Sequence, residues 1–78
     1  MPTLTLVPSK SAVQRKLAGF HQGTPLKLTF KAGETLATVL DRFNEYRSPD
    51  NQIEQLFTLG NPLPMKTVLQ QDLQLEVP

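Results

Sequence analysis

One apolar stripe at helical spacing, set between stretches of alternating polar and apolar residues, limits what this chain can fold into. The stripe follows Thr35, a good N-terminal cap, and recurs every 3.6 residues. Its members are Leu36, Val39, Leu40, Phe43 and Tyr46. The pattern predicts a main helix over about residues 35–47, which the turn-forming run 48–51 then ends, because the residue before a proline is disfavoured in helices.

Four segments have the alternation or β-branched content of strands. In chain order they are residues 3–7, 26–31, 53–60 and 72–77. Pro8 ends the first, because proline withholds a ladder donor, and the second alternates most strictly. Residues 61–64 contain two prolines and fit a turn into a short edge segment.

A short helix is predicted near residues 9–19. Its apolar positions are Val13, Leu17 and Phe20. Ser9 or Ser11 can cap its start and Gly19 its end. The predicted fold is a single α+β domain over residues 1–78, with a mixed sheet of four to five strands and one main helix packed across it.

Composition narrows the chemistry. At 78 residues with 38% hydrophobic and 19% charged side chains, the chain is too apolar for disorder and too polar for a membrane span. It has no cysteine, so disulfides, thiolate metal sites and cysteine nucleophiles are excluded. The first eight residues do not read as a signal peptide, and we expect a soluble, cytoplasmic protein.

Catalysis has few candidate residues. His21 is the only histidine and lies in a Gly/Pro turn, where it is expected to face solvent. Asp41 and Glu45 lie one helical turn apart, opposite the apolar stripe, and are expected to form a solvated face. The glycines are isolated, so no phosphate loop is present. We expect no enzymatic activity, no cofactor and no metal.

Charge divides the chain into two halves. Residues 1–39 hold five basic side chains and one acidic one, whereas residues 40–78 hold three basic and six acidic ones. This asymmetry can orient an acidic partner or promote self-contact, or the charges can simply intermix in the folded chain. Nucleic acid is not the expected partner, because the net charge is only +1 and aromatic residues are few.

The order of predicted elements, with one long helix after the second strand, is that of the β-grasp or ubiquitin-like fold. Within this fold the chain resembles the small sulfur-carrier proteins, namely the molybdopterin synthase small subunit and the thiamine-pathway carrier. The segments that carry the resemblance are Gly33-Glu34-Thr35-Leu36, Asn61-Pro62-Leu63-Pro64 and residues 68–77.

Sulfur transfer in that family implies a flexible carboxy-terminal Gly-Gly. Here the sequence reads Glu76-Val77-Pro78 and has no glycine after Gly60. None of the family's functional residues is therefore transferred. A degenerate or tail-extended sulfur carrier is kept as an alternative function.

The third predicted strand supplies the candidate binding surface. If Leu56 points into the core, alternation turns Phe57 and Leu59 toward the open face of the sheet. The resemblance to ubiquitin-like proteins implies that this face docks partners. In the other interpretation, Phe57 packs beneath the helix of residues 9–20.

The leading hypothesis is a non-catalytic interaction module, adaptor or small subunit that binds a protein partner through the face around Phe57. A further alternative is weak binding of nucleic acid or an acidic partner through the basic amino-terminal half. The candidate binding residues are Phe57, Leu59, Gln55, Gln74, Lys10, Arg15 and Lys16.

Overall fold

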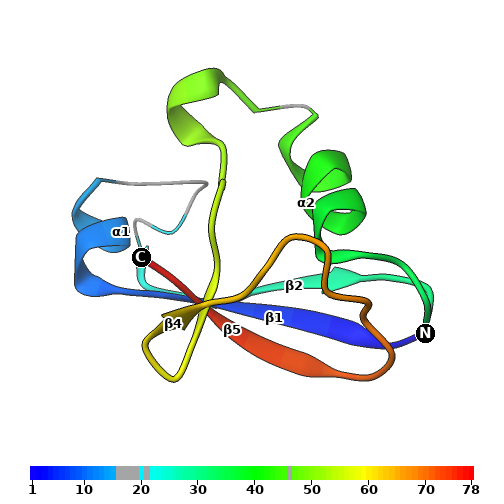
Figure 1. The fold of residues 1–78 in the computed structure, drawn as a ribbon. Coiled ribbons are helices and arrows are strands. Elements are labelled where there is room, and N and C mark those ends of the chain that lie inside the picture. The colour runs from blue at the N-terminus through cyan, green and yellow to red at the C-terminus, as the bar shows by residue number, and fades with distance from the viewer. Residues whose placement is uncertain (16–19, 21, 46) are drawn as a thin grey trace.

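The structure is a computed structural model that describes residues 1–15, 20, 22–45 and 47–78. Within these residues, five strands form one mixed sheet in the order β2-β1-β5-β3-β4 (Figure 1). The strands are β1 (Thr3–Pro8), β2 (Leu26–Thr29), β3 (Phe57–Thr58), β4 (Asn61–Pro62) and β5 (Leu73–Val77). The predicted α+β class and mixed sheet are confirmed.

The first and last strands occupy the centre of the sheet. β1 and β5 run parallel, with Leu4 opposite Leu73 and Pro8 opposite Val77. β2 pairs antiparallel with β1, and the short β3–β4 hairpin joins β5 through one antiparallel pair, Phe57 with Glu76. The hairpin is therefore held to the sheet by much less pairing than β2.

One face of the sheet carries the core. Alternation along β1 and β5 buries every second side chain, and α2 (Leu36–Asn44) lies across this face (Figure 1). The buried core consists of Leu4, Leu6, Ala12, Phe20, Phe30, Leu36, Val39, Leu40, Ile53, Leu56, Leu69, Leu75 and Val77. The opposite face is formed by the alternate, largely polar residues of the same strands.

The main helix begins where the sequence predicts. Thr35 caps it, because its side-chain hydroxyl accepts a hydrogen bond from the Thr38 N–H at 3.3 Å. The last helical residue is Asn44, three residues short of the predicted end, and Tyr46 lies outside the described residues. The Asn44 amide accepts from the Ile53 N–H at 3.0 Å and donates to the Ile53 carbonyl at 2.8 Å, which ties the following segment to the helix.

The first helix, α1, spans only Lys10–Gln14. Ser9 is its cap, with its hydroxyl accepting from the Ala12 N–H at 3.1 Å. Of the predicted apolar positions, Phe20 is buried and Val13 is half-buried, and Ala12 is buried as well. Residues 16–19, which include the predicted apolar position Leu17 and the predicted cap Gly19, lie outside the described residues.

The prediction of a strand over residues 53–60 is wrong in extent, because only Phe57–Thr58 pairs in the sheet. Ile53 and Leu56 are both buried, which is a spacing of three and not the spacing of two that a strand requires. The backbone hydrogen-bonding groups of Ile53 are already taken by the Asn44 side chain. This segment therefore follows α2, and enters the sheet only at its end.

Candidate functional site

The β3–β4 hairpin ends in a two-residue loop with an unusual backbone. Thr58 pairs with Asn61, and between them Leu59 has φ +52° and Gly60 has φ +82°. Two positive φ values are typical of a type I′ turn, whose twist matches that of the flanking strands. Glycine adopts this conformation readily, but leucine does not, because its Cβ crowds the following carbonyl oxygen.

Leu59 is also the most exposed large apolar side chain among the described residues, at 93%. A single exposed leucine is ordinary on a protein surface. A leucine that is both exposed and held at positive φ is less usual, because strained backbone of this kind gathers at functional positions. The apolar tip of the hairpin is therefore the first component of the candidate site.

Phe57 lies on the face of the sheet that α2 does not cover. It stands opposite Glu76 on β5 and opposite Pro62 on β4. Residues directly opposite each other share a face, and Glu76 is exposed between buried Leu75 and Val77. The Phe57 side chain is half-buried. The buried residues of the 9–20 region, Ala12 and Phe20, belong to the core cluster on the other face, so this register favours the open-face interpretation.

Gln74 lies on the same face as Phe57, two residues before Glu76 along β5, and its side chain is exposed. Its neighbour across the strands is Thr5 of β1. Two predicted binding residues, Phe57 and Gln74, therefore share this face with Glu76. Sequence reasoning missed Pro62, which only the register of the hairpin identifies. We call Phe57, Leu59, Pro62, Gln74 and Glu76 the hairpin surface.

Arg15 and Gln55 meet at a different place. Both line an open depression of about 320 Å³ beside Val77 and Pro78 at the end of β5. The Arg15 guanidinium donates to the Ser11 carbonyl at 3.2 Å and to the Pro78 carbonyl. Gln55 is thus beside Arg15 and not on the paired part of β3, and the Arg15 side chain is engaged within the chain.

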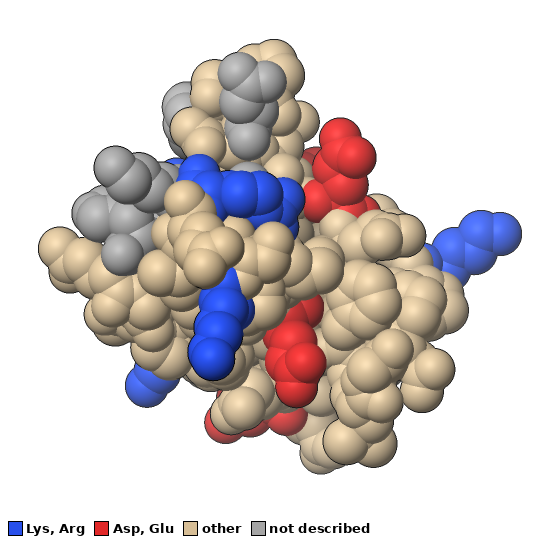
Figure 2. Space-filling model, turned by 90° about the vertical axis from the view of Figure 1, so that its left-hand side faces the viewer, with Lys and Arg blue, Asp and Glu red and all other residues tan. Residues whose placement is uncertain are grey.

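Of the two remaining basic candidates, Lys10 and Lys16, the structure describes one. Lys10 is the exposed first residue of α1, and Lys16 lies outside the described residues. Figure 2 shows the side of the molecule on which α1 and the end of β5 lie, and there basic and acidic side chains are interspersed. On this side the charge division along the sequence does not produce a surface of one sign.

We next consider metal ligands and ionisable groups with a shifted pKa among the described residues. No cluster of three or more histidine, aspartate or glutamate side chains is found among the described residues. The Arg42 guanidinium and the Lys31 N–H lower the pKa of Glu34 below its ordinary value. Lys31 and Glu34 precede α2 and Arg42 lies in its last turn, so none of the three belongs to the hairpin surface. No described helix is long and apolar enough to cross a membrane.

Comparison with known proteins adds no homologue. The chain matches no protein-family model, and a search of curated proteins finds no match.

Proposed function

We propose that this chain is a β-grasp interaction module that binds a protein partner through the hairpin surface. The β-grasp part of the proposal is supported by the strand order β2-β1-β5-β3-β4 and by one helix packed across a single face. That arrangement leaves the other face free of secondary structure in the described chain. The function is binding, and the described residues of the surface include no nucleophile with an adjacent base.

The observation that carries the proposal is the conformation of Leu59. A left-handed backbone destabilises a residue with a side chain by about 1–2 kcal/mol. The Leu59 side chain, at 93% exposure, regains almost nothing through burial in the folded chain. Contact with a second molecule would bury this side chain, and Phe57 and Pro62 behind it would extend the apolar contact.

The rim of the surface supports a protein as the partner. Gln74 and Glu76 are exposed and polar, and they flank Phe57 on the sheet. An apolar centre within a polar rim is the usual composition of a protein interface. The partner expected from this chemistry has an apolar pocket for leucine and hydrogen-bond donors around it.

The test replaces Leu59 with asparagine, which accepts the left-handed conformation and precedes glycine in the most favourable hairpin turn. We expect Leu59→Asn to raise the free energy of unfolding by about 0.5–1 kcal/mol, measured by urea titration. We expect the same variant to lose the proteins that the wild-type chain captures from a lysate of its source cells.

The matched control is Val68→Asn, which removes an exposed apolar side chain at another position, 49% exposed. Captured proteins should be retained by this variant and lost by Phe57→Ala. If Leu59→Asn and Phe57→Ala capture the same proteins as the wild-type chain, the hairpin surface is not the binding site.

A further inference from the structure

A second surface, at the far edge of the sheet from the hairpin, has unpaired backbone. β2 is the edge strand and pairs only with β1. The Phe30 N–H donates to the Pro2 carbonyl at 3.1 Å, which sets the hydrogen-bond alternation of this pair. The backbone groups of Leu26 and Leu28 therefore face β1, and those of Lys27 and Thr29 point outward. No hydrogen bond to these outward groups is found among the described residues.

An open groove of about 300 Å³ runs beside this edge, between β2 and α2. Its lining residues are Lys27, Leu28, Thr29, Val39, Arg42 and Phe43. Three of these side chains are apolar, of which Val39 is buried and Leu28 and Phe43 are half-buried, and the exposed Lys27, Thr29 and Arg42 make the rest of the lining polar. A free strand edge next to a groove that holds apolar side chains is the combination that an added peptide strand uses, with main-chain hydrogen bonds along the edge and side chains in the groove.

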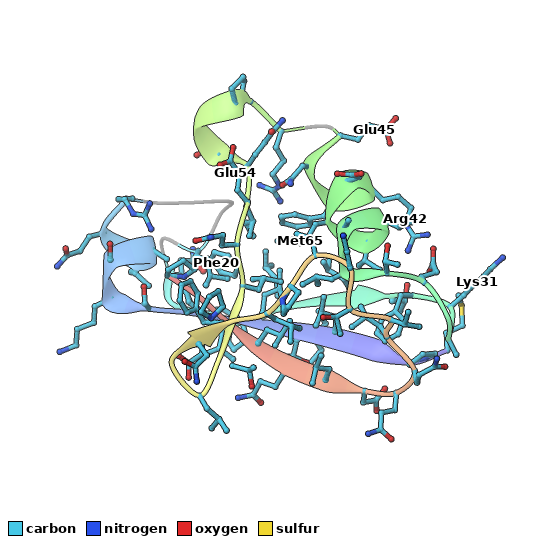
Figure 3. All side chains as sticks on the ribbon, viewed as in Figure 1. Phe20, Lys31, Arg42, Glu45, Glu54 and Met65 are labelled. Carbon is cyan, nitrogen blue, oxygen red and sulfur yellow. The ribbon has the colours of Figure 1, made fainter. Side chains whose placement is uncertain are left out.

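The charges around the groove are mainly positive. Among the described residues, Lys27 and Arg42 are the only charged ones that line it, and the Arg47 guanidinium stands 4.6 Å from the centroid of the Phe43 ring. Glu34, which pairs with Arg42 at 2.5 Å, offsets part of this charge. Figure 3 shows Arg42 projecting from the outer side of α2, on the same side of the molecule as Lys31. The surroundings favour an acidic ligand.

We propose that the β2 edge binds an extended segment of a protein partner in which apolar and acidic residues alternate. Residues opposite each other on neighbouring strands share a face. The side chain opposite Leu28 would therefore enter the groove, and the side chain opposite Lys27 would lie on the open face, where a carboxylate meets the Lys27 ammonium. Lysine on an edge strand also discourages pairing between two copies of the same strand, which favours a partner of different, acidic sequence over a second copy.

This site is separate from the hairpin surface, because β1, β5 and β3 lie between β2 and β4. The proposal therefore stands or fails independently of the proposed function. The probe is a capped seven-residue peptide in which glutamate alternates with leucine, labelled for fluorescence anisotropy. We expect saturable binding with a Kd below about 1 mM, and slowed hydrogen exchange at the Lys27 and Thr29 amides.

Charge is tested by a matched pair of variants. Lys27→Glu should weaken peptide binding by about fivefold or more, whereas Lys66→Glu, an equal charge change at an exposed lysine outside the groove, should change it by less than about twofold. A peptide with lysine in place of glutamate should bind at least about fivefold more weakly than the acidic peptide.

Backbone pairing is tested from both partners. Thr29→Pro removes an outward N–H, a change that an edge strand tolerates, and should abolish binding, whereas Thr29→Val keeps the N–H and should preserve it. Circular dichroism checks that the Thr29 variants are folded. A peptide whose backbone N–H groups are methylated tests the same hydrogen bonds on the wild-type protein, and it should not bind.

Three results would overturn the proposal. The first is that the acidic peptide does not bind, and the second is that the N-methylated peptide binds equally well. The third is that the peptide slows hydrogen exchange at the Phe57 amide and not at the Lys27 and Thr29 amides. Dimerisation of the free chain with protected Lys27 and Thr29 amides would assign the edge to a second copy.

Discussion

The Glu34 carboxylate links the turn before α2 to the last turn of that helix. It accepts from the Lys31 N–H at 2.7 Å and contacts the Arg42 guanidinium at 2.5 and 3.1 Å, immediately before the cap of α2. The hydrogen bond from Arg42, followed by the one from Lys31, lowers the pKa of Glu34 below the ordinary value of 4.5. The carboxylate form is therefore favoured in the folded chain.

A lowered folded-state pKa gives a defined pH dependence. Glu34 contributes stability above its unfolded-state pKa, and this contribution disappears as the pH falls through the lower folded-state pKa. We expect Glu34→Gln to lower the melting temperature at neutral pH, with the difference from the wild-type chain vanishing in acid. Glu45→Gln, which changes an exposed carboxylate just after α2, is the control and should shift the melting temperature less. A Glu34→Gln effect that persists unchanged into acid would contradict the ionic explanation.

Individual residues of the candidate site were predictable to different degrees. The outward direction of Phe57 follows from alternation around Leu56, which is buried as expected. The positive φ of Leu59 was not predictable, because leucine disfavours it and only Gly60 signals the turn. The contact of Arg15 with the Pro78 carbonyl joins positions 63 residues apart, which no local pattern reports.

At the scale of elements, the segment after α2 depends on one side chain. The Asn44 amide makes two hydrogen bonds with the Ile53 backbone, at 2.8 and 3.0 Å. We expect Asn44→Ala to lower the free energy of unfolding by about 1–3 kcal/mol, because both Ile53 groups lose their partner. Asn44→Asp keeps only the acceptor and should fall between the wild-type chain and the alanine variant.

Urea unfolding measures the Asn44 effect, and Asn51→Ala is the comparison. Asn51 is exposed, and within the described part of the chain its side chain bonds only to the Ser48 hydroxyl, so this variant should change stability by less than about 0.5 kcal/mol. Equal losses for Asn44→Ala and Asn51→Ala would show that the amide contacts do not hold the segment.

The elements that were predicted correctly are those in which local pattern and tertiary environment agree. The segments of β1, β2 and β5 alternate in sequence and are packed on one face, and Thr35 caps α2 in the structure as its residue type predicts. The stretch before β3 was assigned incorrectly, because its apolar content resembles a strand while its backbone is held by Asn44. That competing contact becomes visible only when α2 is in place.

For the whole molecule, the central pair of β1 and β5 should dominate stability. Leu75 belongs to β5 and is buried in the core, whereas Leu63 is half-buried and packs against the core cluster. We expect Leu75→Ala to lower the free energy of unfolding by about 2–5 kcal/mol and Leu63→Ala to lower it by less, measured by urea unfolding. A larger loss at Leu63 would place the main support of the fold outside the central pair.

The position of β5 also determines when this chain can fold during synthesis. Leu4 of β1 pairs with Leu73 of β5, so this pair cannot form before β5 has been synthesised. In the described sheet, β5 is also the strand that connects β3 with β1. Because long-range pairing is slow and the ribosome releases the chain from its amino terminus, the β1–β2 hairpin emerges first with its apolar face uncovered. Until β5 has emerged, β1 lacks the strand that pairs with it on its second edge.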